Sequence, residues 1–383
     1  MKIICTQENL NQGLIVVSHI ASKNASLPIL NNILIQAEEN NIRLSATNLE
    51  MGITCLIRGK IEEGGAFTVQ SKLLSDYIGL LPKDKINLET KKGENGEDGS
   101  NILNITCKNY STKIKGMSAS DFPLIPQLSK TNPFVCDALE LRQAVSQVIF
   151  AVSLNETRPE ISGVLLEFSP NKLTLAATDS YRLAEKSINL KNKSNAAPKV
   201  IVPARTLQEV LRILTSFKNP VSLEENKDFN IYVSENQILF ELGGVELISR
   251  LIEGQYPDYK QIIPENFETR LFIESAELTK AVKTASLFTR SGIYDINLDA
   301  NLAEKELVIS STNSQLGENV SRLPIKIEGK KNNILLNYRY LLDGLQNIDA
   351  QDVELKIVDP NHPCLLKGKD QDNYLYIVMP IKQ

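Results

Sequence analysis

The sequence predicts an α+β protein in which one domain design, two helices packed on antiparallel sheets, is used three times. A strand that runs into Thr followed by Asn or Asp occurs at residues 42–48, 173–179 and 307–313. Its Thr residues, Thr47, Thr178 and Thr312, are spaced 131 and 134 residues apart. Solenoid repeats are far shorter, at about 20–50 residues. The spacing therefore indicates repeated whole domains.

Other landmarks recur in the same register. Leu73, Leu207 and Leu341 each follow a strand, are 134 residues apart, and predict one helix in each domain. Asp121–Pro123 is echoed 134 residues later by Gln255–Pro257. An earlier helix in each domain is predicted from apolar residues at helical spacing. These residues are Leu10, Leu14, Val17 and Ala21; then Leu141, Ala144, Val145, Val148, Ile149 and Val152; then Leu278, Ala281, Val282 and Ala285.

The repeat register gives three domains, at residues 1–127, 128–263 and 264–383. The polar segment Gln127–Pro133 is typical of a linker between the first two domains. The second boundary follows Pro264. Two polar insertions, Lys91–Asn101 and Asn189–Lys199, are predicted to be surface loops.

Composition limits the function classes. The chain has 383 residues, 42% hydrophobic and 23% charged, which is typical of a globular protein. Its net charge of −4 argues against a protein that binds nucleic acid through a general basic excess. The five cysteines form no C-x-x-C pair, which favours a reducing compartment, and no signal peptide or membrane span is expected. We therefore expect a cytoplasmic protein.

The sequence carries little sign of catalytic chemistry. Phosphate-loop, dinucleotide-binding and hydrolase motifs are absent. His362 and Cys364 are two potential metal ligands, but a closed zinc site needs four. Asp179 and Asp258 are candidate carboxylates for a three-domain hydrolase. The repeats place Asn48 and Asn313 where Asp179 stands, however, and an amide cannot transfer protons as a carboxylate does. A side chain that bonds to its own turn backbone is the favoured interpretation, and no catalytic residue, metal or cofactor is expected.

Several specific motifs occur together at Leu27–Leu30, Glu160–Leu166, Ala177–Ala184, Tyr256–Tyr259 and Tyr376–Ile381. In these motifs the chain resembles the beta sliding clamps of bacterial DNA polymerase III, over residues 1–383. The resemblance implies a head-to-tail homodimer whose six domains form a ring around duplex DNA, with helices lining the hole. Such a protein is a processivity factor and not an enzyme. A ring holds DNA by topology, so the net charge of −4 is no obstacle. The implied partners are the polymerase alpha subunit, an ATP-dependent clamp loader, and other polymerases and repair proteins that bind through short peptides.

The resemblance also implies three sets of site residues. A peptide cleft between the second and third domains would comprise Ile161, Thr178, Ser180, Tyr181, Arg182, Leu183, Pro257, Ile262, Asn337, Tyr340, Ile377, Met379, Pro380 and Ile381. DNA would face Lys23, Lys72, Arg142, Arg158, Arg205, Arg212, Lys280, Lys283 and Arg339. The dimer interface would include Ile114, Leu287 and Phe288. Without the resemblance, the apolar end Met379–Ile381 could equally be a last strand packed on the core.

The sequence departs from the family at several positions. Pro159 and Glu160 stand where some clamps have two tyrosines that touch DNA, and a glutamate there would repel a phosphate. Gln261 and Lys382 replace arginines at the cleft margin, which leaves the peptide preference open. A binding scaffold that never meets DNA and the hydrolase remain the alternatives.

Overall fold

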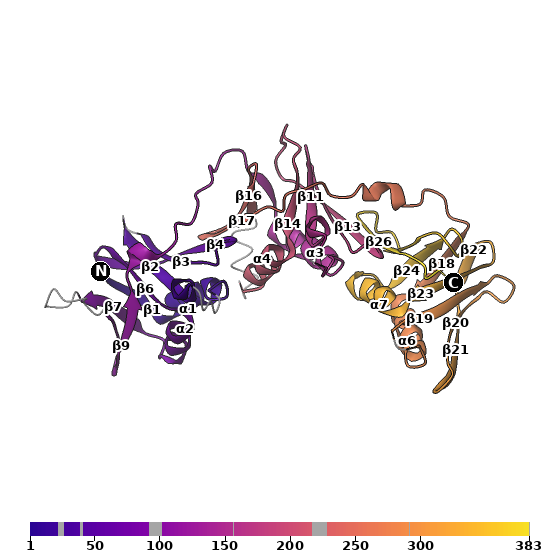
Figure 1. The fold of residues 1–383 in the computed structure, drawn as a ribbon, viewed down its shortest axis with the longest axis horizontal. Coiled ribbons are helices and arrows are strands. Elements are labelled where there is room, and N and C mark those ends of the chain that lie inside the picture. Colours follow the sequence, from indigo (N-terminus) through magenta and orange to yellow (C-terminus); the bar gives the residue numbers. More distant parts are fainter. Residues whose placement is uncertain are drawn as a thin grey trace. The chain divides into compact units, whose positions relative to one another are not determined.

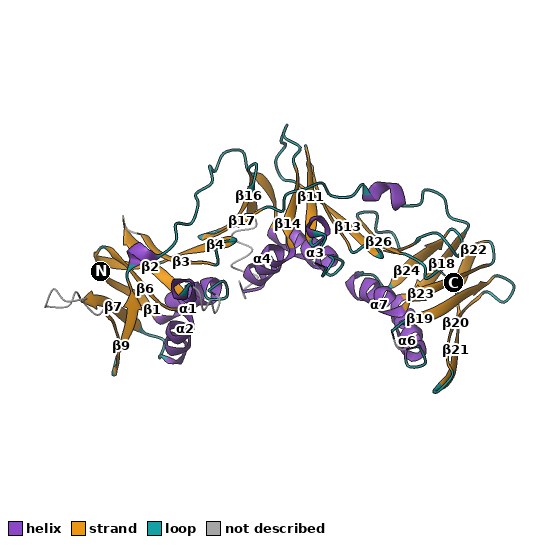
Figure 2. Ribbon diagram, viewed as in Figure 1, coloured by secondary structure: helices purple, strands orange, loops and turns teal. Residues whose placement is uncertain are grey.

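The computed structural model describes residues 1–21, 27–38, 41–91, 102–155, 157–216, 228–290 and 292–382. Within these ranges the chain forms α-helices and antiparallel sheets, as predicted (Figures 1 and 2). Lys23 and most of the predicted insertion Lys91–Asn101 lie outside the described residues. The described part of the chain divides into two compact units. Unit 1 comprises residues 1–138 and 209–251, and unit 2 comprises residues 139–208 and 252–383.

The described residues form six α-helices, two in each third of the chain. They are α1 (Gln7–Val17), α2 (Ser71–Leu80), α3 (Ala138–Ile149), α4 (Ala204–Ser216), α6 (Ser275–Ser286) and α7 (Tyr338–Asn347). The predicted apolar stripes are largely buried, although Ala21 and Val152 lie beyond the helix ends. In α2 the buried residue is Leu74, whereas Leu73 is 48% exposed. The first repeat is therefore one residue out of the predicted register at this helix.

Unit 1 contains a thirteen-stranded sheet in which every pair of neighbours is antiparallel. In spatial order its strands are β10 (Phe134–Asp137), β15 (Asp228–Val233), β16 (Gln237–Leu242), β17 (Val245–Arg250), β4 (Met51–Ile57), β3 (Asn41–Thr47), β2 (Asn32–Glu38), β6 (Gly65–Gln70), β9 (Tyr110–Met117), β8 (Ile102–Cys107), β7 (Lys85–Lys91), β1 (Lys2–Thr6) and β5 (Gly59–Glu63). The β17–β4 ladder thus joins a strand from the middle of the chain to one from its first third.

Unit 2 contains a nine-stranded and a four-stranded sheet, both antiparallel. The larger has the order β14 (Lys199–Pro203), β11 (Gly163–Ser169), β12 (Lys172–Thr178), β13 (Arg182–Asn189), β26 (Tyr374–Val378), β25 (Cys364–Gly368), β24 (Asp352–Ile357), β18 (Thr269–Glu274) and β22 (Lys326–Gly329). The smaller has the order β21 (Gly317–Pro324), β20 (Glu306–Asn313), β19 (Asp295–Asn301) and β23 (Asn332–Asn337). The β13–β26 ladder joins the middle of the chain to its last third.

Alternation along the strands explains how the sheets receive the helices. In β19 the residues Ile296, Leu298 and Ala300 are fully buried, while their neighbours are not, which is the period-two pattern of a sheet with one core face. The helices pair as α1 with α2 and α6 with α7, and they pack on the strands. Gly13 of α1 permits one such approach, because a Cβ there would lie 2.5 Å from Cγ2 of Ile57 on β4.

The repeated Thr-Asn/Asp phrase ends a strand in a turn that its own side chains close. Thr178 Oγ1 donates to the carbonyl of Arg182 at 2.7 Å. The carboxylate of Asp179 accepts from the backbone N–H groups of Tyr181 and Arg182, each at 2.9 Å. Asn313 accepts from two backbone N–H groups in the same way. The prediction that Asp179 bonds to turn backbone is confirmed.

Candidate functional site

The predicted cleft residues gather on unit 2 where β13 meets β26. Leu183 pairs with Ile377 in this ladder, and both side chains are fully buried in a cluster that also contains Ile161. These three residues therefore form a floor. Tyr181, by contrast, is 62% exposed and stands above that floor at the turn. Thr178 is buried and serves the turn described above.

The C-terminal segment is held on two sides. The N–H of Met379 donates to the carbonyl of Tyr181 at 2.9 Å, and the N–H of Ile381 donates to the carbonyl of Leu335 at 2.8 Å. Met379, Pro380 and Ile381 remain only half-buried, although they follow a fully buried strand. The segment is thus both anchored by backbone bonds and available at the surface.

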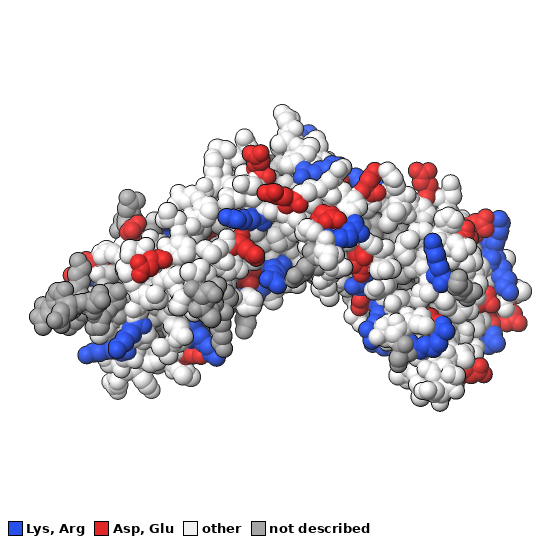
Figure 3. Space-filling view, viewed as in Figure 1, with Lys and Arg blue, Asp and Glu red and all other residues white. Residues whose placement is uncertain are grey.

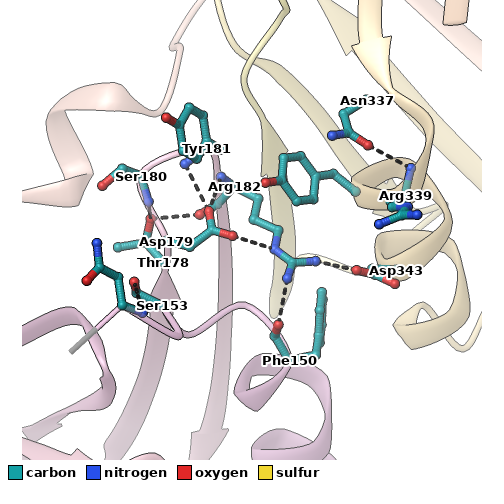
Figure 4. Close-up of polar contacts among 12 residues, drawn as sticks. Phe150, Ser153, Thr178, Asp179, Ser180, Tyr181, Arg182, Asn337, Arg339 and Asp343 are labelled. Carbon is teal, nitrogen blue, oxygen red and sulfur yellow. Dashed lines mark hydrogen bonds and ion pairs between the residues drawn. The ribbon is translucent and has the colours of Figure 1, made fainter. Parts of the chain in front are cut away.

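Arg182 connects the turn to helix α7 (Figure 4). Its Nε donates to Asp179 Oδ2 at 2.9 Å, its terminal nitrogens donate to Asp343 and to the carbonyl of Phe150, and its side chain is only 13% exposed. The guanidinium carbon lies 5.5 Å from the centre of the Phe150 ring and 4.7 Å from that of Tyr340. Cation–π contacts and charged hydrogen bonds of this kind are strongest when water is excluded. Asp343 and Phe150 were not predicted, because both lie far from the Ala177–Ala184 motif in the sequence.

Aromatic and amide side chains complete the rim. The rings of Tyr181 and Tyr340 stack with centroids 6.4 Å apart and an interplanar angle of 18°. Asn337 caps α7, because its side-chain oxygen accepts from the N–H of Arg339 at 2.9 Å (Figure 4). Ser180 has a φ of 78°, and its hydroxyl accepts from Arg158 at 3.1 Å. Most of the predicted cleft residues are therefore joined by contacts around this turn.

The segment after β17 is tied across the outer face of the same sheet. The hydroxyl of Tyr256 donates to the carbonyl of Ala176 at 3.3 Å, and that of Tyr259 donates to Glu185 at 2.6 Å. Burial raises the pKa of Tyr259 well above its usual range, and the Glu185 carboxylate raises it further. Pro257 lies between these tyrosines and is half-buried. The segment leads to Ile262, which is 40% exposed at the end of the short 3-10 helix Tyr259–Ile262.

Ion pairs fix the same segment further along. Glu167 accepts from Lys199 at 2.8 Å and from Lys260 at 2.9 Å. Partial burial would raise the pKa of the Glu167 carboxyl, but hydrogen bonds from the two lysines outweigh burial and hold it below its usual value. Gln261, which stands at a margin where the family often has arginine, donates to Asp258 at 2.8 Å.

Exposed cations are distributed over the helices. Lys and Arg are interspersed with Asp and Glu on the face shown in Figure 3, in keeping with the net charge of −4. The predicted DNA-facing residues on the helices are all exposed, and none forms an ion pair with a described residue. They are Lys72 on α2, Arg142 on α3, Arg205 on α4, Lys280 and Lys283 on α6, and Arg339 on α7. The guanidinium of Arg339 lies 3.6 Å from the centre of the Tyr294 ring, which restrains it.

Two other predicted cations are engaged within the chain. Arg212 donates to Glu209 and to the carbonyls of Ile15 and Val16, in the last turn of α1, where a helix attracts positive charge. Arg158 pairs with Glu160 at 3.1 Å. Glu160 was expected to repel a phosphate, and the structure shows that it also offsets the charge of Arg158. The guanidinium of Arg212 is committed to holding α1.

The predicted dimer residues differ in their exposure. Leu287 is 70% exposed just beyond α6, and Phe288 is half-buried. Ile114, however, is only 5% exposed, because it occupies an inward position on β9 opposite Leu103. The side chain of Ile114 therefore belongs to the core of unit 1, and the exposed aromatic on this strand is Tyr110, at 54%. The flanking lysines 113 and 115 in the sequence are the alternation signal for this placement.

The residues proposed for a metal site or a hydrolase have other roles. Cys364 is buried and donates to the carbonyl of Val378, while His362 bonds to Asp359. Among the described residues, no three His, Cys, Asp or Glu side chains form a group that could hold a metal ion. No helix in the described ranges is long and apolar enough to cross a membrane.

Comparison with known proteins covers almost the whole chain. Residues 1–126, 136–258 and 260–382 match the N-terminal, central and C-terminal domain models of the DNA polymerase III beta subunit. The chain is 29% identical to the beta sliding clamp of Synechocystis over 398 aligned positions, covering 100% of this chain and 99% of that one. It is 30% identical to that of Staphylococcus aureus, covering 94% of each chain.

Solved structures agree with these sequence matches. A putative DNA polymerase III beta subunit from Eubacterium rectale superposes with a TM-score of 0.90 at 30% identity, covering 100% of both chains. The DNA polymerase sliding clamp of Bacillus subtilis superposes with a TM-score of 0.91 at 25% identity, covering 100% of this chain and 99% of that one.

The three clamp domains, with their paired helices and antiparallel sheets, define a DNA sliding clamp, a non-catalytic processivity factor for DNA polymerase. The hydrolase alternative and the scaffold that never meets DNA are thereby excluded. The chain belongs to the DNA polymerase III beta subunit family.

Proposed function

We propose that two copies of this chain associate head to tail into a six-domain ring that encircles duplex DNA. The observation that carries the proposal is the presence of three clamp domains in one chain with an unpaired sheet edge toward each end. A heterologous contact between two such chains generates a closed ring. The three domains would have the boundaries 1–127, 128–263 and 264–383.

The two edges suit such a contact. On β9, residues 110–115 pair with β8 on one side, and among the described strands β6 reaches only Gly116 and Met117 on the other. β21 pairs only with β20 among the described strands and exposes Val320. Edge strands offer free N–H and C=O groups to another chain. We infer that β9 of one protomer pairs with β21 of its partner, beside Leu287 and Phe288.

The exposed helix cations would contact the phosphates. Lys72, Arg142, Arg205, Lys280, Lys283 and Arg339 have no carboxylate partner among the described residues, so their charge is available. Contacts to phosphate carry no sequence information, which suits a ring that slides. Arg158 would contribute less, because Glu160 offsets its charge, and Arg212 is left out because its donors are used within the chain.

Partner peptides would bind at the Tyr181 turn. Its buried floor, the stacked Tyr181 and Tyr340, and the anchored but half-exposed Met379–Ile381 support a preformed site for an extended apolar segment. The partners would be the polymerase alpha subunit, the ATP-dependent loader, and other polymerases and repair proteins.

Retention on DNA tests the ring. Clamp loaded onto nicked circular DNA should remain bound in 1 M salt (a concentration of about a 3 Å Debye length) and should be released when the DNA is cut to a linear form. A protein held by phosphate contacts alone would leave both forms, because salt weakens such contacts steeply. Loss from the uncut circle in high salt would refute encirclement.

Truncation tests the peptide site. Deleting residues 379–383 should abolish binding of a polymerase peptide, while sedimentation should still show a dimer. Dissociation of the dimer by this deletion would place these residues at the interface instead.

A further inference from the structure

Two adjoining pockets lie on one face of the unit 1 sheet, where the chain after β9 crosses β4 and β17. Their volumes are about 530 and 270 Å³, and both are lined by Leu124, Pro126, Gly52 and Ile248. Gly52 and Ile248 are paired across the β17–β4 ladder, so they share a face. We call the two pockets together the Leu124 groove. Nothing in the mechanism of a sliding ring uses this surface.

One end of the Leu124 groove is a repeat of the turn at the proposed peptide site. Thr47 Oγ1 donates to the carbonyl of Met51 at 2.9 Å, as Thr178 Oγ1 donates to that of Arg182 at 2.7 Å. Asn48 accepts from two backbone N–H groups, as Asp179 does. The third residue of each turn has the same unusual backbone, with φ of 75° at Leu49 and 78° at Ser180.

The neighbouring strand end is repeated as well. The N–H of Arg250, at the end of β17, donates to the carbonyl of Glu50 at 3.0 Å. The N–H of Met379, just after β26, donates to the carbonyl of Tyr181 at 2.9 Å. The same backbone frame, a closed turn bonded to the end of an adjacent strand, therefore occurs twice in the chain, once in each unit.

The side chains on the two frames differ, and the difference leaves the Leu124 groove open. The position of the buried Leu183 is taken by Gly52, on which Ile125 packs so closely that a Cβ would lie 2.8 Å from its Cγ2. Leu124 is 96% exposed and Leu49 is 51% exposed. Two exposed leucines thus border pockets that apolar side chains can enter.

The charges around the groove favour acid. Arg43 lines the larger pocket and Arg250 the smaller one, and neither guanidinium has a partner among the described residues. Lys130 and Glu246 neutralise each other at 2.8 Å. Glu50 is the opposing charge in the smaller pocket, so the unpaired side chains leave the Leu124 groove positive.

We propose that the Leu124 groove is a second docking site, for an extended peptide of a partner protein that carries leucine side chains between Asp or Glu residues. The leucines would enter the two pockets, and the carboxylates would pair with Arg43 and Arg250. The inference rests on the proposed function, because it gives the same class of partner a second contact on the clamp.

The test uses full-length clamp and clamp lacking residues 379–383, with a fluorescein-labelled Asp-Leu-Glu-Leu-Asp peptide followed by fluorescence anisotropy. The truncated clamp should retain binding, which Leu124→Asp or Arg250→Glu should weaken at least tenfold. The peptide with lysine in place of each acidic residue should not bind. Leu154→Asp is the matched control, because Leu154 is 94% exposed in unit 2 and should leave affinity unchanged. A side chain as exposed as Leu124 can be replaced without unfolding the protein.

The outcomes separate the two proposals. Residual binding that is insensitive to Leu124→Asp and Arg250→Glu overturns the Leu124 groove. So does complete loss of binding on truncation, which would leave the site at the Tyr181 turn standing. If truncation changes nothing and Leu124→Asp in the full-length clamp removes all binding, the groove stands and the Tyr181 site fails for this peptide.

Discussion

Replacing Arg182 should loosen the connection between the Tyr181 turn and α7 in unit 2. In Arg182→Ala, Asp343 and the carbonyl of Phe150 lose a charged donor, and the ring of Tyr340 loses its cation. Removing one member of a buried ion pair costs about 3–5 kcal/mol. The value here should lie at the lower end, about 3 kcal/mol, because the Asp343 side chain is 42% exposed and water can solvate it. Asp179 also keeps its two backbone donors.

Hydrogen exchange measures this change locally, which matters because a chain of two compact units need not unfold in one step. A loss of about 3 kcal/mol corresponds to exchange roughly a hundredfold faster for the amides of the β13–β26 ladder and α7. Arg182→Lys should give an intermediate increase, because lysine keeps the charge but not the planar fork. Arg158→Ala, which removes an exposed ion pair, is the control and should leave these amides unchanged. Exchange in Arg182→Ala within threefold of the unmodified chain would refute the reasoning.

Three further predictions concern separate parts of the chain. The folded pKa of Glu167 is held below its ordinary value of 4.5, so its ion pairs contribute stability above that value and lose it as the pH falls; the difference in Tm between the protein and Glu167→Gln should shrink to nothing between pH 6 and pH 3, and a constant difference would contradict this. Leu287→Glu should raise the dimer Kd at least tenfold in sedimentation, with Leu302→Glu as the control; equal values for both would remove Leu287 from the interface. Burial raises the pKa of Cys364 to about 12, so iodoacetamide at pH 8 should label it only in denaturant, and labelling of the folded protein would show that the thiol is accessible.

Short-range patterns predicted the repeated elements well. The strand before Thr178 and its counterparts, and the helices that follow, are local features that periodicity reports directly. Phe122 and Tyr256, which mark the ends of the first two domains, are both buried at equivalent places. The error at Leu73 has a simple cause, because a spacing rule cannot detect a one-residue shift when two leucines are adjacent.

Long-range contacts were beyond such patterns. Arg182 finds Asp343 at a separation of 161 residues, and Arg212 reaches the end of α1 across 197. An arginine that holds a helix end and one that awaits a phosphate look the same in sequence, because only the fold decides which acceptor is near. Ile114 could have been assigned correctly, since alternation between lysines already indicates an inward side chain.

The ladders that cross from one third of the sequence to the next have a consequence for how the chain was built up and can be taken apart. Cutting at the sequence repeat after residue 127 would strip β4 of its neighbour β17 and leave a bare hydrophobic margin. The gene's duplicated segments are therefore not autonomous modules. Swapping one between homologues should succeed only when the adjoining strand travels with it.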